Sequence, residues 1–361
     1  MKKNQNYKSI ILWLSTALLT VFIMIFVGGI TRLTDSGLSM VEWRPMMGTI
    51  PPLTQADWEI AFSKYKQFPE YQKINSNMVL KEFKWIFFWE YFHRMIGRFL
   101  GLLFIFPYII FKLKNKIPNI IHSRLILLFL LGAFQAVIGW YMVKSGLIDR
   151  PDVSHYRLAL HLSVALIIYS LILWLLLTTQ QLNKKTPIIN LNSQIKNRLK
   201  LKKHSIAIIV LISAQILYGV LMAGLKGGLG FNTWPKMGAE WLPVEIFNRT
   251  PFLLNFLEST YVLQFMHRWL GVLVALSCIV FSIKILKSNS PLSPHHKPYL
   301  NLKYAAFCLI LMVSMQFILG VGSLVMMVPI SVASLHQIGA IILLSISLYI
   351  TFILNNEKIH I

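Results

Sequence analysis

Long apolar runs alternate along the chain with short segments rich in charged residues, proline and glycine. The runs lie near residues 10–30, 85–111, 121–143, 155–178, 204–225, 258–286, 300–327 and 330–354. Each has the length of about 20 residues that a membrane-spanning helix requires. The composition agrees, because 56% of the residues are hydrophobic and the mean hydropathy is +0.61. The pattern therefore predicts an all-α polytopic membrane protein with eight transmembrane helices.

The two halves of the chain repeat each other. His93 and His161 are 68 residues apart, and His267 and His336 are 69 apart. The motif His-Arg-x-x-Gly occurs at 93–97 and 267–271, and Gln-x-x-x-Gly occurs at 135–139 and 316–320. We therefore expect two pseudo-symmetric four-helix bundles, at 1–180 and 204–361, joined by a basic cytoplasmic linker at 181–203.

The net charge of +22 does not indicate a nucleic-acid partner, because the lysines gather in segments that share one side of the membrane. The linker is the most basic of these segments. The positive-inside rule then places both termini in the cytoplasm and the segments 31–84 and 226–255 outside. The N-terminus resembles neither a cleaved signal nor a transit peptide. We expect a multi-pass protein of the bacterial plasma membrane, with the lipid bilayer as its surroundings.

Four histidines share one depth in the predicted bundles. His93, His161, His267 and His336 each lie about 5–8 residues from the outer end of an even-numbered helix, or roughly 8–12 Å inside. An isolated histidine here could simply hydrogen-bond across a helix interface. Four in register favour two facing pairs of metal ligands, since polar groups in hydrocarbon are costly. Clustered cysteine, methionine or carboxylate ligands are missing, so haem is preferred over zinc or copper.

One acidic residue distinguishes the two predicted sites. Glu90 lies three residues before His93, on the same helix face, whereas the second half has Gln264 in this place. A salt bridge with Arg94 or Arg98 is the alternative role for Glu90. We infer that the N-terminal site carries out a reaction and that the C-terminal site holds a haem for structure or electron transfer.

Two arginines follow the histidines directly. Arg94 and Arg268 are difficult to explain as lipid-facing residues, and they could pair with haem propionates. Snorkelling toward the outer interface is the competing explanation. The outer segments add Arg32, Arg44 and Trp234, which are candidates for capping the two pockets or for an interfacial aromatic belt.

Nearly the whole chain resembles the haem A synthase family in its α-proteobacterial and mitochondrial form. The motifs that carry the resemblance lie at 28–34 (GGITRLT), 36–45 (SGLSMVEWRP), 48–53 (GTIPPL), 82–94 (EFKWIFFWEYFHR), 231–235 (FNTWP) and around His161, His267 and His336. Members oxidise a methyl group of haem O to a formyl group, giving haem A for terminal oxidases.

The resemblance also implies roles for individual residues. It makes His93 and His161 the ligands of the substrate haem O, Glu90 the catalytic carboxylate, and His267 and His336 the ligands of a bound haem b. Some members carry a cysteine pair in the first outer loop; this chain has only Cys278 and Cys308, both inside predicted helices. An electron route through thiols of that loop is therefore not expected here.

Partners and alternative functions follow from the same features. The enzyme that makes haem O and an electron acceptor are candidate partners. The spacing of Gly97 and Gly101 is compatible with a homo-oligomer and equally with packing inside a bundle. A di-haem cytochrome b would share the histidine pairs but would not explain Glu90 in one half only. A transporter with internal repeats would bind no haem.

Overall fold

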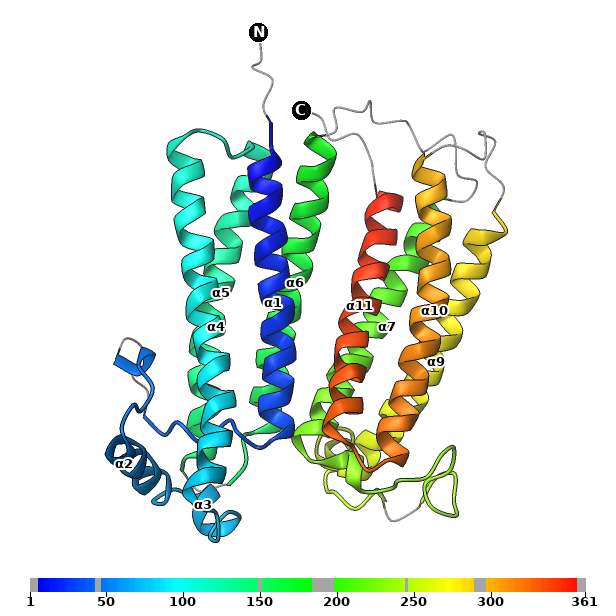
Figure 1. The fold of residues 1–361 in the computed structure, drawn as a ribbon. Coiled ribbons are helices and arrows are strands. Elements are labelled where there is room, and N and C mark those ends of the chain that lie inside the picture. Colours follow the sequence, from blue (N-terminus) through cyan, green and yellow to red (C-terminus); the bar gives the residue numbers. More distant parts are fainter. Residues whose placement is uncertain are drawn as a thin grey trace. The chain divides into compact units, whose positions relative to one another are not determined.

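The computed structural model describes residues 6–42, 47–148, 151–183, 198–243, 246–288 and 297–355. Eight helices in these ranges are long and apolar enough to cross a membrane (Figure 1). They are α1 (Lys8–Leu33), α4 (Leu80–Leu113), α5 (Asn119–Gly146), α6 (His155–Asn183), α7 (Arg198–Gly224), α9 (Thr260–Leu286), α10 (Lys297–Val325) and α11 (Ile330–Asn355). The predicted class, all-α with eight membrane helices, is confirmed.

The helix ends differ from the expected ones mainly where a helix continues beyond the membrane. α4 has 34 residues, or about 51 Å at the helical rise, against a hydrocarbon core of about 30 Å. It begins at Leu80 rather than near residue 85, and its first turns pack on the outer segment. α7 is described from Arg198, inside the expected linker, and the Arg198 Nε donates a hydrogen bond to the carbonyl of Leu354.

The chain divides into two compact units, Met1–Leu175 and Leu176–Ile361. The boundaries proposed from the sequence stay a prediction, and most of the linker 181–203 lies outside the described residues. Arg44 of the first outer segment also lies outside them.

In unit 1 the four membrane helices follow one another around a bundle. α1 packs on α4, where the Trp13 and Phe104 rings are 5.1 Å apart. Phe104 in turn contacts Phe129 of α5. Phe22 of α1 lies 6.5 Å from Tyr169 of α6.

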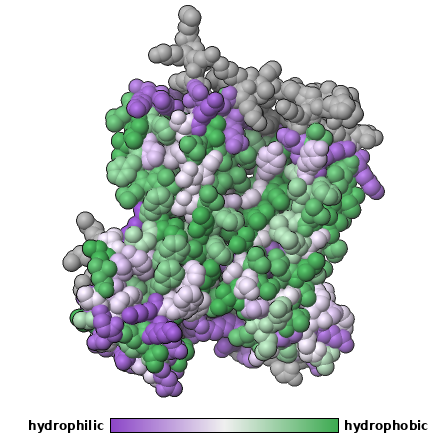
Figure 2. All heavy atoms as spheres, in the orientation of Figure 1, coloured by the Kyte–Doolittle hydropathy of each residue, from purple (hydrophilic) through white to green (hydrophobic). Residues whose placement is uncertain are grey.

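In unit 2 the contacts form a closed ring of neighbours: α7 packs on α9, α9 on α10, α10 on α11, and α11 on α7. Buried apolar side chains line its interior, among them Ile212, Leu263, Leu309 and Leu344. This is a four-helix bundle, and Figure 2 shows hydrophobic side chains over the middle of the helices with hydrophilic ones toward their ends.

Residues 31–84, called the first outer segment after the side predicted for them, have a core of their own. Two short helices, α2 (Gln55–Tyr65) and α3 (Pro69–Lys73), lie in Figure 1 at the end of α4 opposite its connection to α5. α2 begins with a capping box between Thr54 and Asp57. Phe62 and Tyr65 of α2 pack against Phe83 and Phe87 of α4. The extension of α4 is therefore buried by the segment that precedes it.

Candidate haem sites

Each of the four histidines faces a glycine on the membrane helix that precedes its own. A methyl group on Gly28 would lie 3.0 Å from Cε1 of His93, and one on Gly139 would lie 3.2 Å from Cε1 of His161. For Gly219 with His267 and Gly320 with His336 the distance is 2.8 Å. Real Cβ atoms rarely approach so closely, so only glycine leaves room for these imidazoles. The four glycines form a set of histidine seats, one on each of α1, α5, α7 and α10.

Three of the seats carry a second contact, made by a glutamine four residues before the glycine. The side-chain amide of Gln135 donates to the backbone carbonyl of His161 at 2.9 Å. Gln215 donates to the carbonyl of His267 at 2.9 Å, and Gln316 to that of His336 at 2.7 Å. Each bond ties two helices together at the level of the histidine. Gln135 and Gln316 belong to the motif noted in the sequence; Gln215 with Gly219 is a third copy.

The two imidazoles of the second pair are separated by a distance typical of ligands that share one metal atom. The rings of His267 and His336 have centroids 6.3 Å apart and are nearly perpendicular, at 85°. Two metal–nitrogen bonds of about 2 Å each take about 4 Å of this separation. The remaining distance matches the two half-rings, so the separation of the rings equals the span of one metal atom between two imidazoles; in this structure Nε2 of His267 lies 3.3 Å from the Gln215 side-chain amide.

The hydrogen bonds of His336 also suit a metal ligand. Its Nδ1 lies 3.2 Å from the backbone carbonyl of Gln316, which leaves Nε2 as the free nitrogen if Nδ1 carries the proton. In unit 1, Nδ1 of His161 is a buried polar atom with no hydrogen-bond partner in the part of the chain that the structure describes.

Glu90 is held at one end of the N-terminal site by the outer segment. Its side chain is 3% exposed. One carboxylate oxygen accepts hydrogen bonds from the Ser39 hydroxyl at 2.7 Å and the Met40 backbone N–H at 2.8 Å. The other forms an ion pair with Arg94, whose guanidinium also donates to the Met40 carbonyl at 3.1 Å. Three donors, one of them cationic, therefore fix the position of the Glu90 side chain.

The C-terminal site repeats this arrangement with a neutral group. Gln264 donates to the carbonyl of Phe231 at 3.0 Å. Arg268 donates to the same carbonyl and to those of Thr233 and Lys236, at 2.6–3.1 Å. Position for position, the structure thus places a glutamate with an arginine against one outer segment and a glutamine with an arginine against the other.

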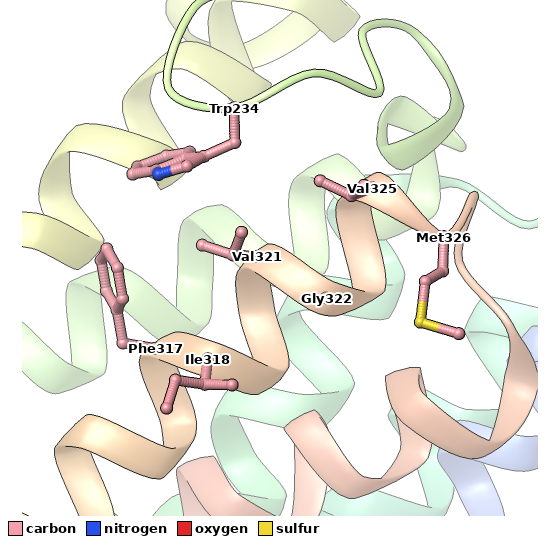
Figure 3. A pocket seen from close by; sticks show the side chains of 7 residues that line it. All are labelled: Trp234, Phe317, Ile318, Val321, Gly322, Val325 and Met326. Carbon is pink, nitrogen blue, oxygen red and sulfur yellow. The ribbon is translucent and has the colours of Figure 1, made fainter.

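The predicted site residues do not all have the surroundings expected from the sequence. Arg94 forms an ion pair with Glu90, which was the alternative role considered for this carboxylate. Arg268 donates to backbone carbonyls. Contact of either arginine with a propionate stays a prediction. Arg32 pairs with Asp35, and Trp234 lies 5.6 Å from Phe317 at the mouth of an apolar cavity of about 430 Å³ beside α10 (Figure 3).

Known proteins are similar to this chain over almost its full length. Residues 11–348 match the family described as cytochrome oxidase assembly protein. A protein of Flavobacterium psychrophilum named heme A synthase is 43% identical over 349 residues, covering 96% of this chain and 98% of its own. The chain belongs to the haem A synthase family. Relatives with that name from Rickettsia bellii and Nitrosospira multiformis are 41% and 39% identical, each over 97% of this chain and at least 94% of their own.

Membership of the haem A synthase family gives the described geometry its context. The chain is therefore an oxidoreductase. Its eight apolar helices and its bacterial relatives fit a multi-pass protein of the bacterial inner membrane. Sequence reasoning missed the glycine seats, Gln215 and the Ser39 contact. A search for Gln-x-x-x-Gly in every apolar run would have found Gln215, whereas nothing in the sequence relates Ser39 to Glu90 across 51 positions.

Proposed function

We propose that the protein makes haem A by oxidising the methyl group of haem O to a formyl group in its N-terminal unit, through hydroxylated intermediates. The observation that carries this proposal is a difference in charge between two similar sites. Both have seated histidine pairs and an arginine bound to the outer segment, but only the first has a carboxylate, at Glu90. The names of the relatives support haem A as the product.

In this proposal His93 and His161 bind the substrate haem O, and His267 and His336 bind a haem b. Haem b would supply one-electron transfer toward an external electron acceptor. The histidine seats explain how the chain orients its ligands: a glycine fixes the plane of each imidazole, and for three of the four a glutamine fixes the helix that carries the histidine. The rings are thus positioned before haem binds, which reduces the entropy that binding costs.

Glu90 is proposed as the catalytic carboxylate. It accepts a proton released during the oxidation or stabilises positive charge developing at the substrate carbon. Its three donors hold it in place in an apolar environment, where a fixed charge acts more strongly than in water. Gln264 offers no charge, so the C-terminal site would hold its haem without oxidising it.

The deciding experiment replaces Glu90 by Gln. Membranes of a bacterial host that supplies haem O would be solubilised, and the haems retained by the purified protein would be separated by chromatography with mass detection. We expect the variant to retain haem O and haem b but to yield no haem A, or to stop at the alcohol. Glu82→Gln, on the same helix outside the membrane-spanning part, is the matched control and should behave as the wild type. Unchanged haem A in Glu90→Gln would remove this residue from the mechanism.

The proposed topology follows from the basic segments. We propose that both termini are cytoplasmic and that the haem sites lie toward the outer side. A cysteine introduced at Gln67 of the outer segment should react with an impermeant maleimide in intact cells. A cysteine introduced at Lys114 of the α4–α5 connection should react only after the membrane has been permeabilised. Reaction of both from the same side would contradict this orientation.

A further inference from the structure

The seat of His93 differs from the other three. Its glycine, Gly28, is preceded four residues earlier by Met24, where the other seats have Gln135, Gln215 and Gln316. The three glutamines donate hydrogen bonds of 2.7–2.9 Å to the backbone carbonyl of the facing histidine. A thioether has no N–H and cannot make this bond.

Met24 occupies the same position in space as the glutamine it replaces. Gly97 and Gly271 each lie four residues after a histidine. A methyl group on Gly97 would lie 3.1 Å from Cε of Met24, and one on Gly271 would lie 3.1 Å from Nε2 of Gln215. The end of each side chain therefore reaches the same point of the neighbouring helix. The packing between α1 and α4 is retained, but the polar contacts of these helices differ: the Thr31 hydroxyl donates to the carbonyl of Trp89 at 3.4 Å and the Trp13 indole to that of Leu103 at 2.9 Å, and neither reaches the carbonyl of His93.

We propose that Met24 makes His93 the least firmly braced of the four histidines, so that the N-terminal site exchanges its haem whereas the C-terminal site retains it. This inference rests on the proposed function, in which the first site takes a substrate and the second a resident cofactor. A substrate site has to open once in every reaction cycle to release its product. A resident cofactor gains nothing from such an opening.

The asymmetry lies within the first site as well as between the sites. His161 has the glutamine brace, through Gln135, and His93 does not. Opening would therefore separate α1 from α4 at the level of His93, where the bond of 3.4 Å from Thr31 to Trp89 lies one turn away, while the shorter bond from Gln135 keeps α5 and α6 tied. An interhelical side-chain hydrogen bond in a membrane is worth a factor of about 3 to 30 in the equilibrium between joined and separated helices. If haem leaves only from the separated state, its release rate should change by the same factor.

The test adds the missing brace and removes an existing one. In Met24→Gln the new side chain is unbranched and of similar length, so it fits the space of the thioether. Met24→Leu changes the shape without adding a donor and is the matched control. Gln215→Met makes the reverse change in the second unit. The full-length proteins, loaded with haem O and haem b, would be mixed with excess apomyoglobin as a haem acceptor, and the haem remaining on the protein would be identified by chromatography over time.

Met24→Gln should slow the release of haem O about threefold to thirtyfold and leave haem b unchanged, and Met24→Leu should change neither rate by more than about twofold. Gln215→Met should speed the loss of haem b by a similar factor. Equal haem O release from Met24→Gln and Met24→Leu would overturn the inference, as would an unchanged loss of haem b from Gln215→Met. If Met24→Gln slows haem b instead of haem O, the brace is supported but the proposed assignment of haems to the two sites is wrong.

Discussion

The glycine seats predict a graded loss of haem when a methyl group is added. The perturbation is Gly→Ala at each seat. The added Cβ would lie 2.8 Å from the imidazole at Gly219 and Gly320, 3.0 Å at Gly28 and 3.2 Å at Gly139. Ordinary contact begins near 3.4 Å, so the histidine has to move by about half an ångström at the tightest seats.

The magnitude follows from two opposing effects. An extra methyl group in a packed interior costs about 1–3 kcal/mol. Alanine gains up to about 1 kcal/mol over glycine within a helix, and this gain is the same at every helical position. The helices should therefore still form. The steric clash should lower the affinity for haem, because the imidazole that has to move is the one proposed to bind the iron. A cost of 1–3 kcal/mol corresponds to a loss of roughly fivefold to 150-fold in affinity.

The assay is the haem content of purified protein, with each haem identified by chromatography. Gly219→Ala and Gly320→Ala should lose haem b, whereas Gly139→Ala should show the smallest loss, and that in haem O. Gly132→Ala and Gly101→Ala are matched controls inside α5 and α4, since a methyl group at either position meets no atom within 4 Å. Full haem b in Gly219→Ala, or an equal loss in Gly132→Ala, would refute the view that these glycines seat the ligands.

Two further predictions concern the outer segment. Ser39→Ala removes a donor to the Glu90 carboxylate and should slow haem A formation about 10- to 100-fold without loss of either haem, while Ser36→Ala, equally buried but bonded to Thr34, should not. Equal rates in both variants would exclude a positioning role for Ser39. Burial raises the pKa of Glu70 to about 8, and nearby Glu90, Asp35 and Asp152 also raise it; the Tyr65 hydroxyl, which donates to it, has the opposite effect. Because this pKa is raised in the folded state, the associated stability is complete below the unfolded pKa of about 4.5 and is lost as the pH rises through about 8. The midpoint of thermal unfolding should therefore decline from about pH 4.5 to about pH 8 in the wild type, and Glu70→Gln should lack this decline; the same decline in the variant would assign it to other groups.

The membrane helices could be predicted from the sequence because lipid imposes a simple requirement on them. A backbone in hydrocarbon has to satisfy its own hydrogen bonds, so an apolar run of sufficient length is a helix. The ends were less predictable. α4 continues for several residues past the apolar run since Phe83 and Phe87 are buried by Phe62 and Tyr65 of α2, a contact that depends on the path of the intervening chain.

The candidate site was predictable where it repeats. His93, His161, His267 and His336 were found because the two halves of the chain place the same residues at the same spacing, and Glu90 was found because it breaks this repeat. Ser39 and Met40 could not be found in this way. The donors of Glu90 come from an outer segment of irregular backbone, where no periodicity relates sequence position to position in space.

The repeat also explains why a single substitution could separate two functions. When two sites share their ligands and their helix packing, a difference at one position acts on one site alone and leaves the other intact. Glu90 against Gln264 changes the charge beside the haem without changing the contact with the outer segment, because Arg94 and Arg268 bind that segment in both units. Met24 against Gln215 changes the tie between two helices without changing the space they fill. In the proposals made above, the first difference would act on the reaction and the second on exchange, so one kind of bundle would serve both a site that converts haem and a site that keeps it.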